Sequence, residues 1–271
     1  MHPILFQTRF FTVHIFWLFI TIGIIVGSYT LIKLSIRNGL KIQFLSDITF
    51  KLILFTIIGA RVVSLIVNFQ SYFYEFSSTT IFKIFYIWDK GINFYGALIG
   101  FFAYLFYACR KNEQNFLKWL DAIIPALILG VAFGHLGAFF EGINYGHETS
   151  LPWGVNFESP WIKYTVPIHP TQIYAFIYSA VISIGLIMIN NLKSIKNRNT
   201  IGLIGLGGIQ IYSFLRFLEG FMRGDDTLLI FGIRLPQIIS LLVIIGSGIF
   251  LYFRYNKLKQ ESLKKPKNAN N

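Results

Sequence analysis

The sequence has few charged residues and a single cysteine. Only 13% of its 271 residues are Asp, Glu, Lys or Arg, whereas about 25% is usual for a soluble protein. Apolar residues make up 54% and aromatic residues 18%, which is more than a soluble domain of this length can keep away from water. An ordinary soluble enzyme is therefore excluded. Because Cys109 has no partner cysteine, a fold held together by internal disulfides is excluded as well.

The sequence also lacks the short motifs of metal, nucleotide and serine chemistry. It contains no H-E-x-x-H, no C-x-x-C, no Walker loop and no G-x-S-x-G. We therefore expect no metal and no cofactor. The formal net charge of +12 would suggest nucleic acid for a soluble protein. In a chain this apolar, the basic residues are expected to mark one side of a membrane instead, with no nucleic-acid partner.

Apolar stretches of about 20 residues, the length needed to cross a bilayer, recur along the chain. There are seven, at 12–32, 49–69, 92–109, 122–140, 170–190, 200–222 and 235–253. They predict an all-α integral membrane protein, a bundle of about seven transmembrane helices with a periplasmic or outer loop region between the fourth and fifth. The fourth and sixth are rich in glycine, which lets helices pack closely, and we expect them inside the bundle.

The basic residues outside the spans predict the topology. Sixteen fall in alternate connections and the C-terminal tail, and six fall on the other side. The positive-inside rule then puts the N-terminus outside and the C-terminus in the cytoplasm. We expect residues 1–254 to form a single polytopic membrane domain and residues 255–271 to form a basic, disordered cytoplasmic tail.

Two arginines, Arg61 and Arg216, fall within predicted spans. A charge at the bilayer centre costs about 2.5–3.5 kcal/mol, so such residues usually face a partner or a cavity. Arg61 is as consistent with locking helices together as with function. Glu219 lies three residues after Arg216 and can pair with it on one helical face. Together with Tyr212 and Arg223 these residues are expected to form one polar stripe, and guanidinium groups on such a stripe suit a phosphate.

An intramembrane histidine is the second unusual feature. His135 stands in the segment FGHLG, where Gly134 and Gly137 leave space beside it. Such a residue either packs through hydrogen bonds or takes part in a site, and the sequence leaves both interpretations open.

The connection from Glu141 to His169 is long and rich in Gly, Pro and Trp, a composition typical of functional loops. Trp153 and Trp161 are expected to anchor it at the membrane interface. Pro170 suits the first position of the next helix. The N-terminus of that helix could hold an anion.

Seven motifs, read in order, resemble one family, the bacterial prolipoprotein diacylglyceryl transferases. The resemblance covers nearly the whole chain, and the motifs are specific in combination although each is weak alone. They are IIGAR, INFYGALIG, FGHLGAFFEGINYG, LPWGVNF, PIHPTQIY, IYSFLRFLEGFMRGDD and LPQIIS.

The resemblance implies a reaction and its partners. A diacylglyceryl group would move from phosphatidylglycerol to the thiol of the lipobox cysteine in a preprolipoprotein, leaving glycerol phosphate. The expected partners are phosphatidylglycerol, the signal peptides of preprolipoproteins and membrane lipids, in the inner (plasma) membrane of a bacterial cell. The family's seven-span topology, with the N-terminus outside, agrees with the charge count.

The family's site residues are only partly present. The positions that match are Tyr212, Arg216, Arg223, Gly146, His169, Gln172 and Tyr174. Tyr95 stands where the family usually has His, His135 where it has its phospholipid-binding Arg, and Ala138 where it has Asn or Cys. Phe16 replaces the Tyr of the first span, and Glu219 lies one position short of the usual acid.

These substitutions suggest a rearranged active site. His135 has a reference pKa near 6.5 and is better suited than Tyr95, near 10, to accept the proton of a thiol. We therefore expect His135, Tyr95 and Tyr212 to act in catalysis. Arg216, Arg223 and Arg61 would then bind the lipid phosphate. Two alternatives remain: an inactive or repurposed relative of the family, or a transporter without chemistry, which would need polar residues along several spans.

Overall fold

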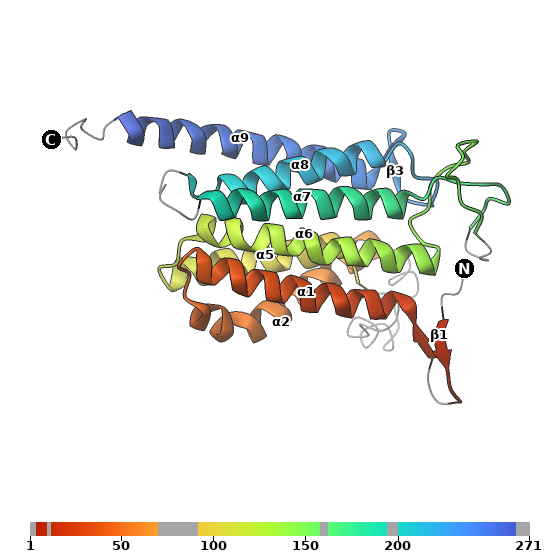
Figure 1. Ribbon diagram of the computed structural model, residues 1–271, viewed down its shortest axis with the longest axis horizontal. Helices are drawn as coiled ribbons and strands as arrows, with labels where there is room; N and C mark the ends of the chain where they lie inside the picture. The colour runs from red at the N-terminus through yellow and green to blue at the C-terminus, as the bar shows by residue number, and fades with distance from the viewer. Residues whose placement is uncertain (1–3, 10–11, 70–91, 158–161, 194–199, 264–271) are drawn as a thin grey trace. The chain divides into compact units, whose positions relative to one another are not determined.

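The computed structural model describes residues 4–9, 12–69, 92–157, 162–193 and 200–263. In that part of the chain the regular secondary structure consists of helices and two short hairpins, and a long irregular loop joins α6 to α7 (Figure 1). The helices are α1 (Ile15–Arg37), α2 (Ile42–Val67), α5 (Phe94–Lys111), α6 (Phe116–Glu141), α7 (Thr171–Lys193), α8 (Leu203–Glu219) and α9 (Leu235–Leu263). The hairpins pair β1 (Ile4–Gln7) with β2 (Thr12–His14), and β3 (Leu229–Ile230) with β4 (Ile233–Arg234), both antiparallel.

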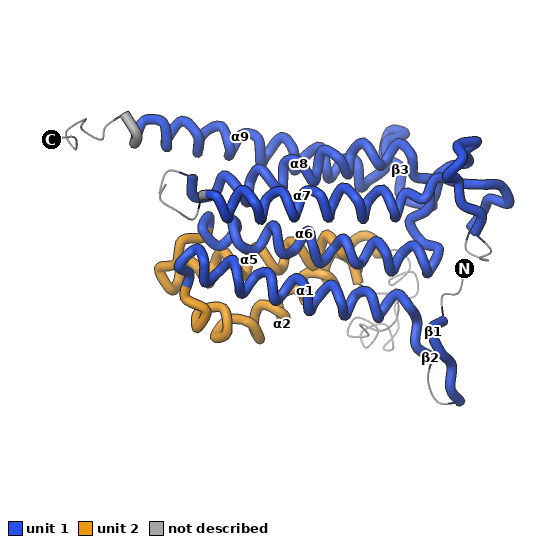
Figure 2. The backbone as a smooth tube through the Cα atoms, in the orientation of Figure 1, with its two compact units in different colours: residues 1–40, 117–271 blue, residues 41–116 orange. Residues whose placement is uncertain are grey.

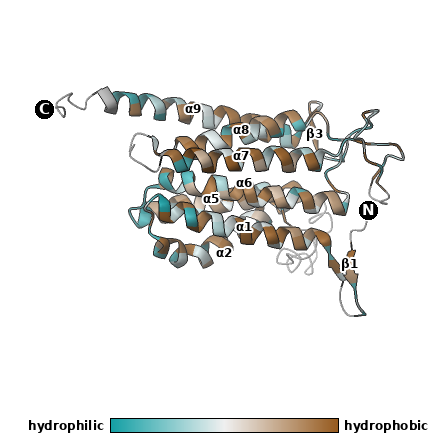
Figure 3. Cartoon of the chain, viewed as in Figure 1, coloured by the Kyte–Doolittle hydropathy of each residue, from teal (hydrophilic) through white to brown (hydrophobic). Residues whose placement is uncertain are grey.

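Five helices are long and apolar enough to cross a membrane by length and composition: α1, α2, α6, α7 and α9. The brown colour of apolar residues runs along these helices in Figure 3. Helix α8 has 17 residues and is about 26 Å long, a little less than the hydrocarbon thickness. An all-helical integral membrane protein is therefore borne out, whereas the count of seven spans stays a prediction.

The chain divides into two compact units (Figure 2). The first unit contains residues 1–40 and 117–271, and therefore α1, most of α6, and α7 to α9. The second unit contains residues 41–116, with α2 and α5.

Helix α6 is the central helix of the first unit. Half of its most apolar 18-residue window is buried, against a third or less in the other four candidate spans. Its Gly130 packs so closely against α1 that a Cβ on Gly23 would lie 2.6 Å from the Gly130 carbonyl oxygen. The hydroxyl of Ser183 on α7 donates to the Pro125 carbonyl, 2.7 Å away. Close glycine contacts of this kind agree with the expectation that the fourth predicted span lies inside the bundle.

A buried carboxylate on α6 fixes the start of α8. Asp121 accepts hydrogen bonds from the backbone N–H groups of Gly202, at 2.6 Å, and Gly205, at 2.8 Å. Gly202 has a φ of +89°, which favours glycine. The first N–H groups of a helix have no partner within the helix, so an acceptor from α6 both satisfies them and sets the position of α8.

The end of α8 corrects one sequence prediction. The helix ends at Glu219, and Gly220 follows where a Cβ would lie 2.3 Å from the Gln237 side chain of α9. A larger residue at position 220 would therefore have to displace the Gln237 side chain. Arg223 lies beyond the helix, and the prediction of one continuous stripe from Tyr212 to Arg223 is wrong for its last member.

Helix α9 corrects a second prediction. It continues to Leu263, so residues 255–263 are helical rather than part of a disordered tail. No glycine or proline interrupts the sequence between Gly248 and Pro266, and Leu258 is buried. Residues 264–271 of the predicted tail lie outside the described residues.

In the second unit, α2 and α5 pack closely along a glycine seam. A Cβ on Gly59 would lie 2.4 Å from the Gly96 carbonyl oxygen, and a Cβ on Gly100 would lie 2.2 Å from that of Phe55. The rings of Phe55 and Tyr104 stack with centroids 4.7 Å apart. Asn93 caps α5 by accepting from the Gly96 N–H at 3.1 Å.

Candidate functional site

The polar centre of the first unit is the end of α8. Arg216 donates from Nη1 to Oε1 of Glu219, as the three-residue spacing predicted. The Tyr178 hydroxyl on α7 donates to the other oxygen, Oε2, at 2.7 Å. The Glu219 side chain is 4% exposed and that of Arg216 is 17% exposed. The carboxylate is buried and the guanidinium is largely buried, so contacts from two helices give the Arg216 guanidinium a fixed place.

Two further predicted residues lie at this centre. The Tyr212 ring meets the Tyr178 ring edge to face, with centroids 5.8 Å apart. His135 on α6 lies within electrostatic range of Arg216, Glu219 and Arg223. Its Nε2 is buried and has no hydrogen-bond partner among the described residues. The structure thus places the His135 imidazole within electrostatic range of an ion pair that is far from it in the sequence.

The loop between α6 and α7 is tied to the segment after α8 by main-chain hydrogen bonds. The Gly146 N–H donates to the His169 carbonyl at 3.1 Å, and the His147 N–H donates to the Met222 carbonyl at 2.9 Å. A Cβ on Gly146 would lie 2.6 Å from both Cβ and the carbonyl oxygen of His169. Gly146 is therefore needed because two backbones approach it closely.

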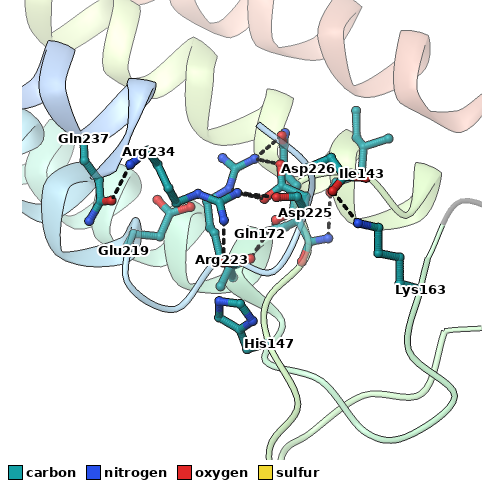
Figure 4. Close-up of polar contacts among 12 residues, drawn as sticks. Ile143, His147, Lys163, Gln172, Glu219, Arg223, Asp225, Asp226, Arg234 and Gln237 are labelled. Atoms are coloured by element: carbon teal, nitrogen blue, oxygen red, sulfur yellow. Dashed lines mark hydrogen bonds and ion pairs between the residues drawn. The ribbon is translucent and has the colours of Figure 1, made fainter. Parts of the chain in front are cut away.

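Arg223 is the hub of a polar network in this loop region (Figure 4). Its Nε donates to Asp225 Oδ1 at 2.8 Å, and its Nη2 donates to Asn144 Oδ1 at 2.6 Å. Arg234 donates to Asp225 Oδ1 and to the Arg223 carbonyl, both at 2.8 Å. Burial lowers the pKa of the Arg234 guanidinium, although the neighbouring Asp225 carboxylate opposes that shift. Arg223 thus joins the α6–α7 loop to the connection between α8 and α9.

A surface ion pair lies beside this network. Lys163 donates to Asp226, and this hydrogen bond raises the pKa of the Lys163 ammonium. The contact joins the α6–α7 loop to the residues after Arg223. Since the Lys163 side chain is well exposed, the pair adds little stability.

Helix α7 begins with two buried polar residues. The Thr171 hydroxyl donates to the Asn144 carbonyl at 2.7 Å, and Gln172 Nε2 donates to the Ile143 carbonyl at 2.8 Å. Gln172 is 1% exposed, and its Oε1 has no hydrogen-bond partner among the described residues. A buried acceptor without a donor is unfavourable, so this atom is suited to receive a hydrogen bond from a bound molecule.

The Tyr174 hydroxyl joins two other loop residues. It lies 3.2 Å from Nδ1 of His169 and accepts a hydrogen bond from Trp153 Nε1 at 2.7 Å. The structure thus places two predicted site residues in contact. It also gives Trp153 a hydrogen-bond partner; Trp161 lies outside the described residues.

The remaining predicted residues form none of the contacts described above. Arg61 is buried on α2, and Tyr95 stands in the first turn of α5, next to Phe94; both belong to the second unit. Ala138 is buried on α6.

Several residues of the network were not predicted from the sequence. They are Asn144, Tyr178, Asp225 and Arg234. Asp225 stands two residues after Arg223 in the quoted segment FMRGDD, so the polar run there was a usable signal. Tyr178 gave no such signal, because its contact depends on the packing of α7 against α8.

Comparisons with known proteins agree with the motifs. The family model described as prolipoprotein diacylglyceryl transferase matches residues 3–253. A phosphatidylglycerol–prolipoprotein diacylglyceryl transferase of Prochlorococcus marinus (strain MIT 9215) is 30% identical over 90% of this chain and 89% of its own length. A protein of the same name from Clostridium tetani is 30% identical over 95% of this chain and 100% of its own length.

A third relative, from Prochlorococcus marinus subsp. pastoris, has the same name and is 32% identical over 90% of this chain and 89% of its own length. Both the family model and these relatives cover nearly the whole sequence, and the residues matched by the family model include every element of the candidate site. The chain therefore belongs to the prolipoprotein diacylglyceryl transferase family.

Proposed function

We propose that this protein transfers a diacylglyceryl group from phosphatidylglycerol to the lipobox cysteine of preprolipoproteins. In this reaction the cysteine sulfur forms a bond to a glycerol carbon of the lipid. The bond from that carbon to the phosphate oxygen breaks, and glycerol phosphate leaves. The observation that carries the proposal is the Arg216 guanidinium, buried among apolar helices and oriented by Glu219 in a family-matching segment.

Arg216 is proposed to bind the lipid phosphate. A guanidinium has five N–H donors in a planar fork. The Glu219 contact uses one of them and fixes the plane. The remaining donors suit a phosphate that gains charge as the carbon–oxygen bond breaks, because preorganised donors stabilise such charge without reorganising.

His135 is proposed to accept the thiol proton, with Tyr212 beside the reacting groups. Support comes from its buried, unpartnered Nε2 and its closeness to the charges of Arg216 and Glu219. Tyr95 enters the proposal through its place in the family motif, as does Arg61 for the phosphate. His135→Arg restores the family's residue but removes the proposed base. This variant should therefore transfer lipid only when Tyr95→His is added, and activity of His135→Arg alone would contradict the proposed role of His135.

Arg223 is proposed to position the loop rather than to bind phosphate. Its guanidinium is 6% exposed and bonds to Asp225 and Asn144. This removes it from the phosphate-binding set expected from the sequence. Its effect on the reaction would be indirect, through the loop that carries Gly146.

Gln172 is proposed to accept a hydrogen bond from a headgroup hydroxyl of phosphatidylglycerol. Its Oε1 is the buried acceptor without a donor described above, and a glycerol hydroxyl would supply one. His169 and Tyr174, which contact each other at the start of α7, would border the same headgroup.

We further propose the topology that the basic residues indicate. The protein would have seven spans in the inner membrane of a bacterial cell, with the N-terminus outside and the C-terminus in the cytoplasm. The α6–α7 loop would then face the periplasm, the side on which the preprolipoprotein's cysteine becomes available. Residues 1–254 would act as one polytopic membrane domain despite the two compact units.

The experiment that tests the function is complementation. Cells depleted of their own diacylglyceryl transferase should grow when this chain is expressed, and should not grow with Arg216→Ala. A second candidate is an inactive or repurposed member of the family. It is favoured by the three positions that differ from the family's usual residues, Tyr95, His135 and Ala138. Failure of the wild-type chain to support growth, with the protein present in the membrane, would favour that candidate.

A further inference from the structure

A cavity lies between the two helices of the second unit, and none of the residues assigned above lines it. Its volume is about 350 Å³, within the range of small-ligand pockets. It is formed where α2 begins and α5 ends, beyond the stacked rings of Phe55 and Tyr104. The residues that line it are Asp47, Ile48, Lys51, Phe55, Tyr104, Tyr107, Ala108, Lys111 and Asn112.

The lining has a polar part and an apolar part. Lys51 from α2 and Lys111 from α5 bring two ammonium groups, and the two tyrosines bring hydroxyl groups. The wall formed by Ile48, Tyr104 and Ala108 is buried, each residue being at most 8% exposed. A ligand for this cavity therefore needs an anionic group and an apolar portion.

The two lysines outnumber the acidic residues of the lining. Neither forms an ion pair within 4.0 Å among the described residues. Asp47 is the one acidic residue of the lining, and its Oδ1 accepts a hydrogen bond from Gln43 Nε2 at 2.8 Å. Two lysines and one carboxylate give the lining a net positive charge, which attracts an anion, and that attraction is strengthened beside low-dielectric walls.

We propose that this cavity is a second phospholipid site, which holds the phosphate of an anionic lipid between Lys51 and Lys111 and the upper part of an acyl chain against the apolar wall. In the topology proposed above, both lysines belong to the cytoplasmic side, so the lipid would come from the inner leaflet. The site would be separate from the one that performs transfer, because it contains none of the residues around Arg216. The phosphate group that the lysines would bind occurs both in lipid headgroups and as free phosphate. The apolar wall favours the lipid.

The test is a lipid titration of the full-length purified protein followed by native mass spectrometry. The lipids are phosphatidylglycerol and, as a headgroup without net charge, phosphatidylcholine. Wild type is compared with the double variant Lys51→Gln/Lys111→Gln. Each basic side chain near an anionic surface contributes about a fivefold gain in affinity. We therefore expect the double variant to bind one phosphatidylglycerol with an affinity about 30-fold lower than that of wild type.

The matched control is Lys41→Gln/Arg110→Gln. It also removes two positive charges, one from α5 and one from the residue before α2, and neither residue lines the cavity. The control should lower the affinity for phosphatidylglycerol much less than the double variant does, because neither of its side chains lines the cavity. Both variants retain Arg216 and should transfer diacylglyceryl groups like wild type, so this inference and the proposed function fail separately.

Four results would overturn the proposal. The first is wild-type binding by Lys51→Gln/Lys111→Gln, and the second is an equal loss in the control variant. The third is displacement of the bound lipid by inorganic phosphate at an equal concentration, which would make free phosphate the ligand. Equal affinity for phosphatidylcholine would likewise contradict the role of the two lysines.

Discussion

The substitution Arg216→Lys tests the proposed phosphate site with the least change in charge. Lysine keeps the positive charge that Glu219 needs, so the buried carboxylate stays paired. It loses the planar fork, because an ammonium group is compact and cannot donate in parallel to two oxygens of a phosphate. The variant therefore removes ligand geometry while keeping the local ion pair.

The size of the effect follows from the number of donors lost. The Glu219 contact occupies one donor of Arg216, and a lysine that keeps this contact offers the phosphate at least one hydrogen bond fewer. A hydrogen bond to a charged group is worth about 1.5–3 kcal/mol. Because 1.4 kcal/mol corresponds to a factor of ten, kcat/KM should fall by about 10- to 150-fold.

The assay uses purified protein in nanodiscs that contain phosphatidylglycerol, with a synthetic lipobox peptide as acceptor. The matched control is Arg254→Lys, the same substitution on α9, where the guanidinium Nε donates to the Ile201 carbonyl at 3.0 Å. That variant should keep wild-type kcat/KM. Wild-type kcat/KM for Arg216→Lys, at unchanged thermal stability, would show that Arg216 is structural only.

Three further predictions concern the base, the loop and the topology. His135→Gln should nearly abolish transfer in the same assay without lowering the unfolding temperature by more than a few degrees; transfer at the wild-type rate would mean that His135 is not the proton acceptor. Gly146→Ala should destabilise the protein by about 1–3 kcal/mol in thermal unfolding, because the added Cβ would lie 2.6 Å from His169 atoms; unchanged stability would contradict the close approach. Reporter fusions after Lys196 and after Asn271 should both report the cytoplasm, and a periplasmic signal from either would refute the proposed topology.

Local patterns in the sequence predicted the helices and one contact of the site. Apolar stretches indicated each of the long helices, and the three-residue spacing of Arg216 and Glu219 indicated their ion pair, which the structure confirms. The helix ends were less predictable. Helix α2 begins at Ile42 rather than near residue 49, because polar residues such as Ser46 and Asp47 are tolerated in a helix although they lower its hydropathy.

The contacts that organise the site depend on tertiary packing and could not be read from local patterns. Tyr178 reaches Glu219 only because α7 packs against α8. Asp121 caps α8 across a separation of 81 residues along the chain. Arg223 looked like a member of the α8 stripe by helical spacing, but α8 ends at Glu219 and the Arg223 side chain bonds to Asn144 of the α6–α7 loop.

The most direct measurement of the central claim is the mass of a lipobox peptide after incubation with the purified protein and phosphatidylglycerol. The account predicts that the peptide gains one diacylglyceryl group on its cysteine, and that a peptide with serine in place of that cysteine gains none. The Clostridium tetani relative, assayed in parallel, shows whether the conditions support the reaction. An unchanged peptide mass with this protein, when the relative modifies the same peptide, would contradict the account.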